Sequence, residues 1–278
     1  METSELREPF ERMIAGEPDW ATLAESGFLD ALVPETAGGA GLSLAQAGPL
    51  IHVLGYHACA LPAADTMVAR ALLAEAGQDA PDGPIVLASS VQPPPLAETA
   101  AHLLYDDGDG LKLGEAGAVV APQGGLRPVA ALVAAGEIAG AAERMFEMSI
   151  AYANDRVQFG KPIGRQQAIQ HNLAIMAEQV LMTRMAAQIG WAAGLHPTPL
   201  QAAAAKHTAS AAVQTLSAVA HATHGAIGVT EEFCLHRFVK LIYGRRMAHG
   251  SEAYWAKILG EARLSGPEQS SLDFVRSL

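Results

Sequence analysis

The sequence has few cysteines, few charged residues and little positive charge. Its two cysteines, Cys59 and Cys234, lie far apart and match neither a metal-binding nor a redox spacing, so we expect two buried thiols in a reducing cytoplasm. Charged residues make up only 17% of the chain, and the formal net charge is −11. This balance argues against nucleic acid or an anionic membrane as the main binding partner.

Long hydrophobic runs are also missing. No stretch of 18 or more uninterrupted apolar residues occurs, so we expect no membrane-spanning helix. The first residues are charged and lack the apolar core of a secretory signal, which predicts a cytoplasmic location. Alanine, in contrast, is abundant in a chain that is 50% hydrophobic. This composition predicts a mainly α-helical protein with a large core.

Changes in composition along the chain predict three regions and a tail. Amphipathic stretches separated by turn signals predict an N-terminal helical domain over 1–78. Prolines and acidic glycine turns then predict a truncated β region over 79–128. A C-terminal helical bundle is expected over 129–263, followed by a loose tail over 264–278.

Local signals refine the first two regions. The hydroxyl of Ser43 is placed to cap the first turn of a helix, and Pro62 is placed to open the next one. Short apolar runs predict strands at 85–88, 102–105 and 118–120. About fifty residues can form a few strands but not a complete barrel.

Four long helical stretches make up the third region. Apolar periodicity and breaks at glycine and proline predict helices over about 129–155, 165–193 and 200–223, with one or two more within 231–263. Because the links between them are short, we expect the helices to pack antiparallel as a four-helix bundle.

The residues with the clearest binding chemistry lie between these helices. Arg156 closes the first long helix, and Gln158 and Phe159 follow in the link. A guanidinium suits a phosphate, an amide can hydrogen-bond a heterocycle, and a phenyl ring offers a stacking face. Gly225 and Gly228 lie between two later helices, where the backbone can approach a ligand closely. Taken separately, Arg156 also fits a surface ion pair at a helix end, and the glycines also fit a simple helix C-cap.

Taken together, these motifs resemble the acyl-CoA dehydrogenase family. The resemblance lies in the signature stretch at 151–164, its continuation at 166–176, the glycine loop at 224–230 and the N-terminal stretch at 20–41. It implies an N-terminal helical domain, a middle β domain and a C-terminal four-helix bundle, with FAD bound between subunits.

The same resemblance implies roles for individual residues. Arg156 would meet the FAD pyrophosphate, and Gln158 and Phe159 would contact a cofactor held mainly by the neighbouring subunit. Gly225 and Gly228 would let the adenine half approach closely.

Three departures from the family pattern change what the resemblance implies. The middle β region is much shorter than the family's, and 89–93 stands where the family has a segment that contacts flavin and acyl-CoA. The glutamine that precedes the family's glycine loop is replaced by Ala222, and a second glycine is replaced by Ala226. We therefore expect this chain's own cradle for FAD and substrate to be incomplete.

The third departure concerns the catalytic base. The family's glutamate precedes a Gly-Ser or Gly-Thr pair, and His249 occupies that position here, before Gly250 and Ser251. The family's alternative base position falls near Ala130, which cannot accept a proton. His249 is therefore either a base or a histidine that fills a retired active site, and Ser251 is a candidate flavin contact. We expect Glu252 to be a solvated residue of the same helix rather than a substitute base.

Other ionisable residues have simpler interpretations. Arg245 and Arg246 are candidates for a CoA phosphate, although a solvated helix surface is the ordinary expectation. His221 and His224 are three positions apart, but the sequence places no third metal ligand beside them. We expect no metal site.

These features resemble one subunit of the heteromeric acyl-CoA dehydrogenases of steroid degradation, in which two homologous chains form a heterotetramer and one chain supplies the carboxylate. This resemblance implies α,β-dehydrogenation of a bulky acyl-CoA, with FAD as cofactor and an acceptor of the electron-transfer flavoprotein type. Two alternatives remain open. In the first, the chain is a non-catalytic scaffold or regulatory paralogue without flavin. In the second, it is a homomeric acyl-CoA enzyme that uses His249 as its base.

Overall fold

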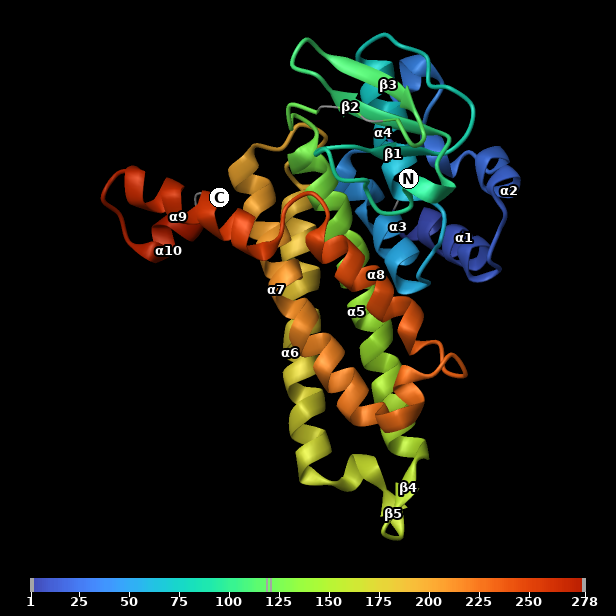
Figure 1. Cartoon of the computed structure of the whole chain (residues 1–278), viewed down its shortest axis with the longest axis vertical. Helices are drawn as coiled ribbons and strands as arrows, with labels where there is room; N and C mark the ends of the chain where they lie inside the picture. Colours follow the sequence, from blue (N-terminus) through green and yellow to red (C-terminus); the bar gives the residue numbers. More distant parts are fainter. Residues whose placement is uncertain (1–2, 119, 121, 277–278) are drawn as a thin grey trace.

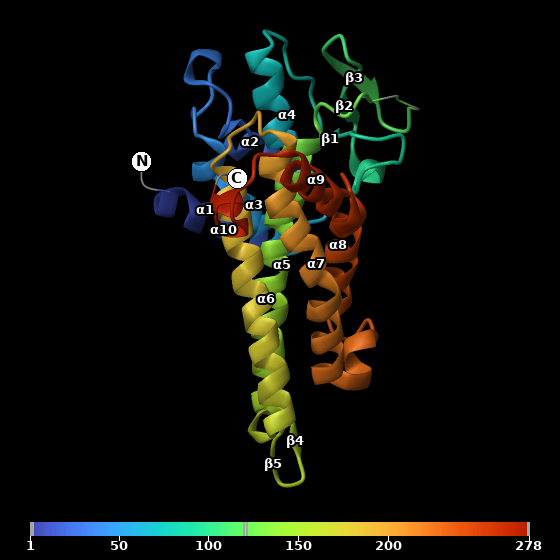
Figure 2. The ribbon, with the colours of Figure 1, turned by 90° about the vertical axis from the view of Figure 1, so that its left-hand side faces the viewer.

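A computed structural model describes residues 3–118, 120 and 122–276, and it shows the mainly α-helical fold that the sequence predicts. A bundle of long helices extends from a head that combines the N-terminal helices with a small sheet (Figure 1). Figure 2 shows that two of the bundle helices, α5 and α6, run the length of the bundle, away from the sheet. None of the helices in the described residues has both the length and the apolarity needed to span a membrane.

Four helices form the N-terminal part of the chain. They are α1 (Thr3–Ala15), α2 (Trp20–Glu25), α3 (Leu44–Tyr56) and α4 (Ala63–Glu75). The predicted cap at Ser43 is confirmed, because the backbone N–H of Gln46 donates to Ser43 Oγ at 3.3 Å. The Gln46 side chain accepts from the Ser43 backbone N–H at 2.9 Å and completes a capping box. Pro62 precedes α4 as predicted.

The sheet has three short strands, β1 (Ile85–Leu87), β2 (His102–Asp106) and β3 (Leu111–Glu115), in the order β1-β2-β3. β1 pairs parallel to β2, and β2 pairs antiparallel to β3. Two predicted strands are thus confirmed. The third, at 118–120, is wrong: Ala118 and Val120 are in irregular structure, and Val119 lies outside the described residues. Asp106 Oδ1 accepts from the N–H of Gly108 at 2.8 Å and stabilises a tight turn at Asp106–Gly110. Because of this turn, β3 begins at Leu111 and not at the expected position 118.

The remaining helices lie close to their predicted positions. They are α5 (Arg127–Asp155), α6 (Gln167–Trp191), α7 (Pro199–His224), α8 (Leu235–Met247), α9 (Glu252–Ser265) and α10 (Ser271–Arg276). A two-stranded hairpin, β4 (Val157–Gln158) and β5 (Lys161–Pro162), joins α5 to α6 at the end of the bundle farthest from the sheet (Figure 1). The tail that we expected to be loose contains the short helix α10, whose residues are mostly exposed.

Close helix contacts join the head to the bundle. A Cβ at Gly140 of α5 would lie 1.9 Å from the carbonyl oxygen of His52, and a Cβ at Gly55 of α3 would lie 2.0 Å from that of Glu137. The ring of Trp191 fills a similar gap, since a Cβ at Gly136 would approach it to 2.6 Å. The backbones of α3 and α5 therefore touch, and one hydrophobic core runs through both parts of the chain.

A buried ion-pair network joins α4, α5 and α8. Arg245 Nε lies 2.6 Å from Glu137 Oε2, and Arg245 Nη1 lies 3.5 Å from Asp65 Oδ2. All three side chains are buried. The suggestion that Arg245 faces a CoA phosphate or solvent is therefore wrong, because both of its charge partners lie inside the core. Arg246, the next residue, pairs with Glu252 nearer the surface.

The environments of the two thiols differ. Cys59 is largely buried, and burial raises its pKa to about 11. Cys234 is exposed, so the expectation of two buried thiols is wrong for this residue. It directly precedes α8 and is followed by the buried Leu235, which takes the inward-facing position in its place.

Candidate functional site

Two cavities lie near opposite ends of α5. The hairpin-end cavity adjoins Arg156 and Gln158, at the C-terminal end of the helix. The sheet-end cavity adjoins Arg127, at its N-terminal end, together with Ser89 and His249. α5 has 29 residues. At about 1.5 Å per residue, roughly 43 Å of helix separates Arg127 from Arg156. The two cavities are therefore separate sites on this chain.

The hairpin-end cavity has a volume of about 490 Å³. It brings together Arg156, Gln158 and Gly225, which the sequence singled out from separate segments. Arg156 is the C-cap residue of α5, and its exposed side chain makes no hydrogen bond or ion pair within the described residues. The guanidinium is therefore available to an anion, rather than engaged in the surface ion pair that was the simpler interpretation.

Phe159 lies at the tip of the β4–β5 hairpin. Its backbone φ is 51°, and that of Gly160 is 76°, so both turn residues are in the left-handed region. Such a turn suits a two-residue hairpin but is strained for a phenylalanine. The ring is 92% exposed and does not line the hairpin-end cavity. An apolar ring held at a projecting tip favours contact with another molecule.

The two glycines of the loop after α7 differ in their surroundings. Gly225 has φ 64° and ψ −142°, which favours glycine, and a Cβ there would meet no atom within 4 Å. Gly228 is buried, and a Cβ there would lie 2.9 Å from that of His224. Gly228 therefore keeps the loop packed on α7, whereas Gly225 opens toward the hairpin-end cavity.

His224 also lines this cavity and lies between two aromatic rings. Its ring centroid is 4.7 Å from that of Tyr152 and 4.8 Å from that of Phe233. Nδ1 pairs with the carbonyl oxygen of Ala220 at 2.8 Å, and the backbone of Met148 is a second hydrogen-bond partner of the ring. Burial lowers the pKa of His224, so the ring is neutral at pH 7. No group of three or more His, Cys, Asp or Glu side chains in the described ranges is arranged to hold a metal ion.

The groups at this cavity fit part of a dinucleotide cofactor. An unpaired guanidinium suits a phosphate, and the amide of Gln158 can hydrogen-bond a heterocycle. Gly225 leaves room for a close approach of the ligand to the backbone. The cavity is too small and too open to enclose a whole FAD, so the fit is to one portion of it.

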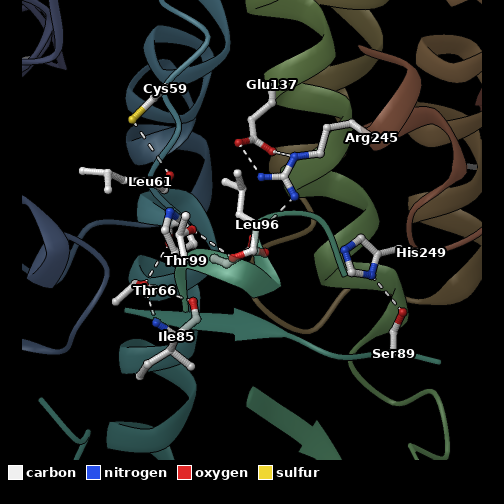
Figure 3. Close-up of polar contacts among 12 residues, drawn as sticks. Cys59, Leu61, Thr66, Ile85, Ser89, Leu96, Thr99, Glu137, Arg245 and His249 are labelled. Carbon is white, nitrogen blue, oxygen red and sulfur yellow. Dashed lines mark hydrogen bonds and ion pairs between the residues drawn. The ribbon is translucent and has the colours of Figure 1, made fainter. Parts of the chain in front are cut away.

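The sheet-end cavity has a volume of about 650 Å³ and lies between 89–95, the start of α5 and the turn that joins α8 to α9. His249 lies in this turn with φ 57° and is 6% exposed. Its Nδ1 lies 2.8 Å from Ser89 Oγ (Figure 3). Burial, reinforced by the charges of Arg245, Lys206 and Arg127, lowers the pKa of His249 to about 3. The ring is therefore neutral near pH 7 and weakly basic.

No carboxylate among the described residues lines this cavity. We expected Glu252 on the same helix as His249, which is wrong: α9 begins at Glu252, and His249 precedes it in a left-handed turn. Glu252 remains partly exposed and pairs with Arg246. Ser251 lines the cavity and caps α9, where its Oγ accepts from the N–H of Tyr254 at 3.4 Å.

Lys206 holds the turn that carries His249. Its fully buried ammonium donates to Ser210 Oγ at 2.8 Å, to the carbonyl oxygen of Arg246 at 2.9 Å and to that of Gly250 at 3.1 Å. Burial lowers the pKa of Lys206 to about 7. Our sequence interpretation missed this residue. The available signal was its isolation, since it is the only Asp, Glu, Lys or Arg between Arg184 and Glu231.

Arg127 was also missed, because nothing in the sequence sets it apart from a surface arginine. Its Nη1 donates to Tyr254 Oη at 2.8 Å, and its Nη2 donates to the carbonyl oxygen of Ser89, also at 2.8 Å. The guanidinium carbon lies 4.9 Å from the centre of the Tyr254 ring. These partners are neutral, and Arg127 forms no ion pair with an acidic residue in the described part of the chain.

The sequence of this chain is similar to sequences of known proteins. The family described as "Acyl-CoA dehydrogenase, C-terminal domain" matches residues 123–264. The chain is 32% identical over 264 residues to acyl-CoA dehydrogenase IpdE2 of Mycobacterium tuberculosis, which covers 81% of this chain and 80% of that protein.

Two solved structures share the fold. The ChsE4-ChsE5 complex from Mycobacterium tuberculosis matches with a TM-score of 0.76 and 19% identity, covering 90% of this chain and 88% of that one. A variant of the Tcur3481-Tcur3483 steroid ACAD matches with a TM-score of 0.80 and 22% identity, covering 95% and 98%. At these identities the likeness is one of fold.

Proposed function

This chain belongs to the acyl-CoA dehydrogenase family, and on that basis we propose that it is the partner subunit of an FAD-dependent heteromer rather than a self-sufficient enzyme. The proposed reaction is α,β-dehydrogenation of a bulky acyl-CoA, with the steroid-derived class as the candidate substrate. A flavoprotein acceptor of the electron-transfer type would reoxidise the cofactor.

The separation of the two cavities carries this proposal. Arg156 lies at one end of α5, roughly 43 Å of helix from Arg127 at the other end, beside the family's base position. In this proposal, a cofactor whose phosphate meets Arg156 extends away from this chain's own His249. Its reactive end would then lie in an active site to which another chain contributes.

The sheet-end cavity supports a heteromer over a homomer. Acyl-CoA dehydrogenation needs a group that accepts the α-proton, while FAD supplies the acceptor for the β-hydride when it is bound. A general base works best with a pKa near the working pH, and His249 has a pKa of about 3. Since no carboxylate lines its cavity, the base is better supplied by a homologous partner.

Exposed apolar surface supports the presence of a partner. Four large side chains of α6 are more than 45% exposed on the bundle surface: Leu181, Met182, Met185 and Ile189. Contiguous apolar patches of this kind mark protein–protein interfaces. The ChsE4-ChsE5 structure is described as a complex, and the Tcur3481-Tcur3483 enzyme carries two chain names, which also favours a pair of chains.

Within such an assembly, this chain's residues would bind and orient the cofactor. Arg156 would neutralise phosphate charge, Gln158 would hydrogen-bond a ring of the cofactor, and Phe159 would cover it from the projecting hairpin. Ser251, which lines this chain's own sheet-end cavity, is the remaining candidate for a flavin contact.

Co-purification tests the proposal. The chain, a homologue that retains the glutamate base, and the two together would be compared for bound flavin and for acyl-CoA-dependent dye reduction. We expect both signals only in the mixture. A lone chain that is yellow and active would instead establish the homomeric enzyme, and a stable complex without flavin would establish the scaffold.

A further inference from the structure

The sheet-end cavity has an unbalanced charge that the proposed function leaves unused. Arg127 lines it and is hydrogen-bonded only to neutral groups, Tyr254 Oη and the carbonyl oxygen of Ser89. No Asp or Glu of the described residues lines the same cavity. The cavity therefore has a net positive environment that a bound anion would balance.

His249 adds a buried hydrogen-bonding group without a partner. Ser89 Oγ makes no hydrogen bond other than that to His249 Nδ1 in the described part of the chain. Donation of its hydroxyl proton to Nδ1 would satisfy Ser89 and place the ring proton on Nε2. Nε2 is buried and unpartnered, on the edge of the ring that faces away from Ser89 (Figure 3). A buried N–H of this kind costs stability unless a ligand accepts its hydrogen bond.

The turn that carries His249 is held in a fixed position. Lys206 binds the carbonyl oxygens of Arg246 and Gly250 on either side of His249. Ser251 starts the 14-residue helix α9 at the cavity wall, so the positive end of the helix dipole adds to the field of Arg127. The donors are thus held by structure that exists before any ligand arrives.

We infer that the sheet-end cavity binds the carboxylate of an organic acid, with the Nε2–H of His249 and the guanidinium of Arg127 as its donors. One uncompensated guanidinium balances the single charge of a carboxylate, whereas a phosphate would need more. Pro93, Pro94 and Met247 line the same cavity and offer apolar surface to a carbon skeleton. An acyl group that carries a free carboxylate is therefore the ligand class. Calling the ligand an acyl group rests on the proposed function, but the carboxylate site does not.

Isothermal titration of the full-length chain alone tests this inference with hexanoate as the probe. Its neutral amide and inorganic phosphate serve as comparison ligands. We expect one hexanoate per chain, with at least tenfold weaker binding of hexanamide and of phosphate. Arg127→Gln and His249→Asn should each weaken hexanoate binding at least tenfold, and Arg127→Lys should lose less. Asparagine suits position 249 because it tolerates the left-handed backbone.

Arg165→Gln provides the matched control, since it removes an exposed arginine near the other end of α5. Thermal unfolding followed by circular dichroism would confirm that each variant is folded. Failure of the wild-type chain to bind hexanoate, equal binding by Arg127→Gln, or a preference for phosphate would each overturn the inference. The titration uses neither flavin nor a partner chain, so its result is independent of the flavin content that tests the proposed function.

Discussion

His249 and Arg245 are four positions apart in the sequence and both are buried, yet the charges around them shift their pKa values in opposite directions. Burial lowers the pKa of His249 to about 3, because no carboxylate faces it and three cations lie nearby. Burial also acts to lower the pKa of Arg245, but the adjacent carboxylates of Glu137 and Asp65 outweigh it and raise the pKa. The first residue is therefore a neutral donor, and the second is a permanently charged structural link.

The neutral state of His249 predicts a pH dependence of stability. Below its ordinary pKa of about 6.5 the unfolded chain takes up a proton that the folded chain cannot, so stability is lost as the pH falls toward 3. Between pH 7 and pH 5 this loss amounts to about 2 kcal/mol. Urea unfolding should show that His249→Asn loses less stability than wild type over this interval, by that amount. Equal losses would mean that His249 titrates as an ordinary histidine.

Arg245 predicts a large cost of truncation. Arg245→Met leaves Glu137 and Asp65 buried without their cation, and we expect a loss of roughly 3–5 kcal/mol in the free energy of unfolding. Arg246→Met, at the neighbouring position, breaks a pair nearer the surface and should cost about 1 kcal/mol or less. Chemical denaturation of both variants gives the comparison. Similar losses in the two would contradict the assignment of Arg245 as the core link.

At the scale of elements, the close contact of α3 with α5 decides how the head sits on the bundle. Gly140 and Gly55 allow that contact, because each faces a carbonyl oxygen of the other helix. The sequence pattern places both glycines inside helices, where glycine is ordinarily unfavourable. Nothing in one sequence indicates which backbone each will meet, since that depends on the packing of distant segments.

A pair of glycine substitutions tests this contact. In Gly140→Ala the new methyl group would overlap the carbonyl oxygen of His52, and we expect a loss of about 1–3 kcal/mol or more in stability. Gly260→Ala in α9 meets open space and should be neutral or stabilising by up to about 1 kcal/mol. Melting temperatures of the two variants would show the difference. Equal tolerance at both positions would mean that α3 and α5 are not in backbone contact.

Local signals predicted the elements well where the physics is local. The capping hydroxyl of Ser43 fixed a helix start, and the Gly160–Pro162 break marked the end of α5 and the link to α6. The third strand was placed wrongly, because a tight acidic turn after Asp106 brought β3 forward to Leu111. Apolar character alone favoured 118–120, whereas the turn geometry decided the register.

At the scale of the whole molecule, the two cavities differ in how much of each could be predicted from the sequence. Arg156, Gln158 and Gly225 belong to recognisable motifs, and the structure brings them to one cavity. The sheet-end cavity combines Arg127 and Lys206 with the turn after α8, from segments that share no motif. The isolation of Lys206 is a weak signal of burial in the sequence, but the contacts of Arg127 and Lys206 with these segments depend on how distant parts of the chain pack.

The affinity of the complex for FAD tests the central claim most directly. Arg156→Ala in the complex with a base-bearing homologue removes a charge-assisted contact to phosphate, worth about 1.5–3 kcal/mol, so FAD should bind roughly 10- to 150-fold more weakly. Equilibrium dialysis against free FAD measures this, with Arg165→Ala as the matched control that should bind like wild type. An unchanged FAD affinity in Arg156→Ala would contradict the shared cofactor site.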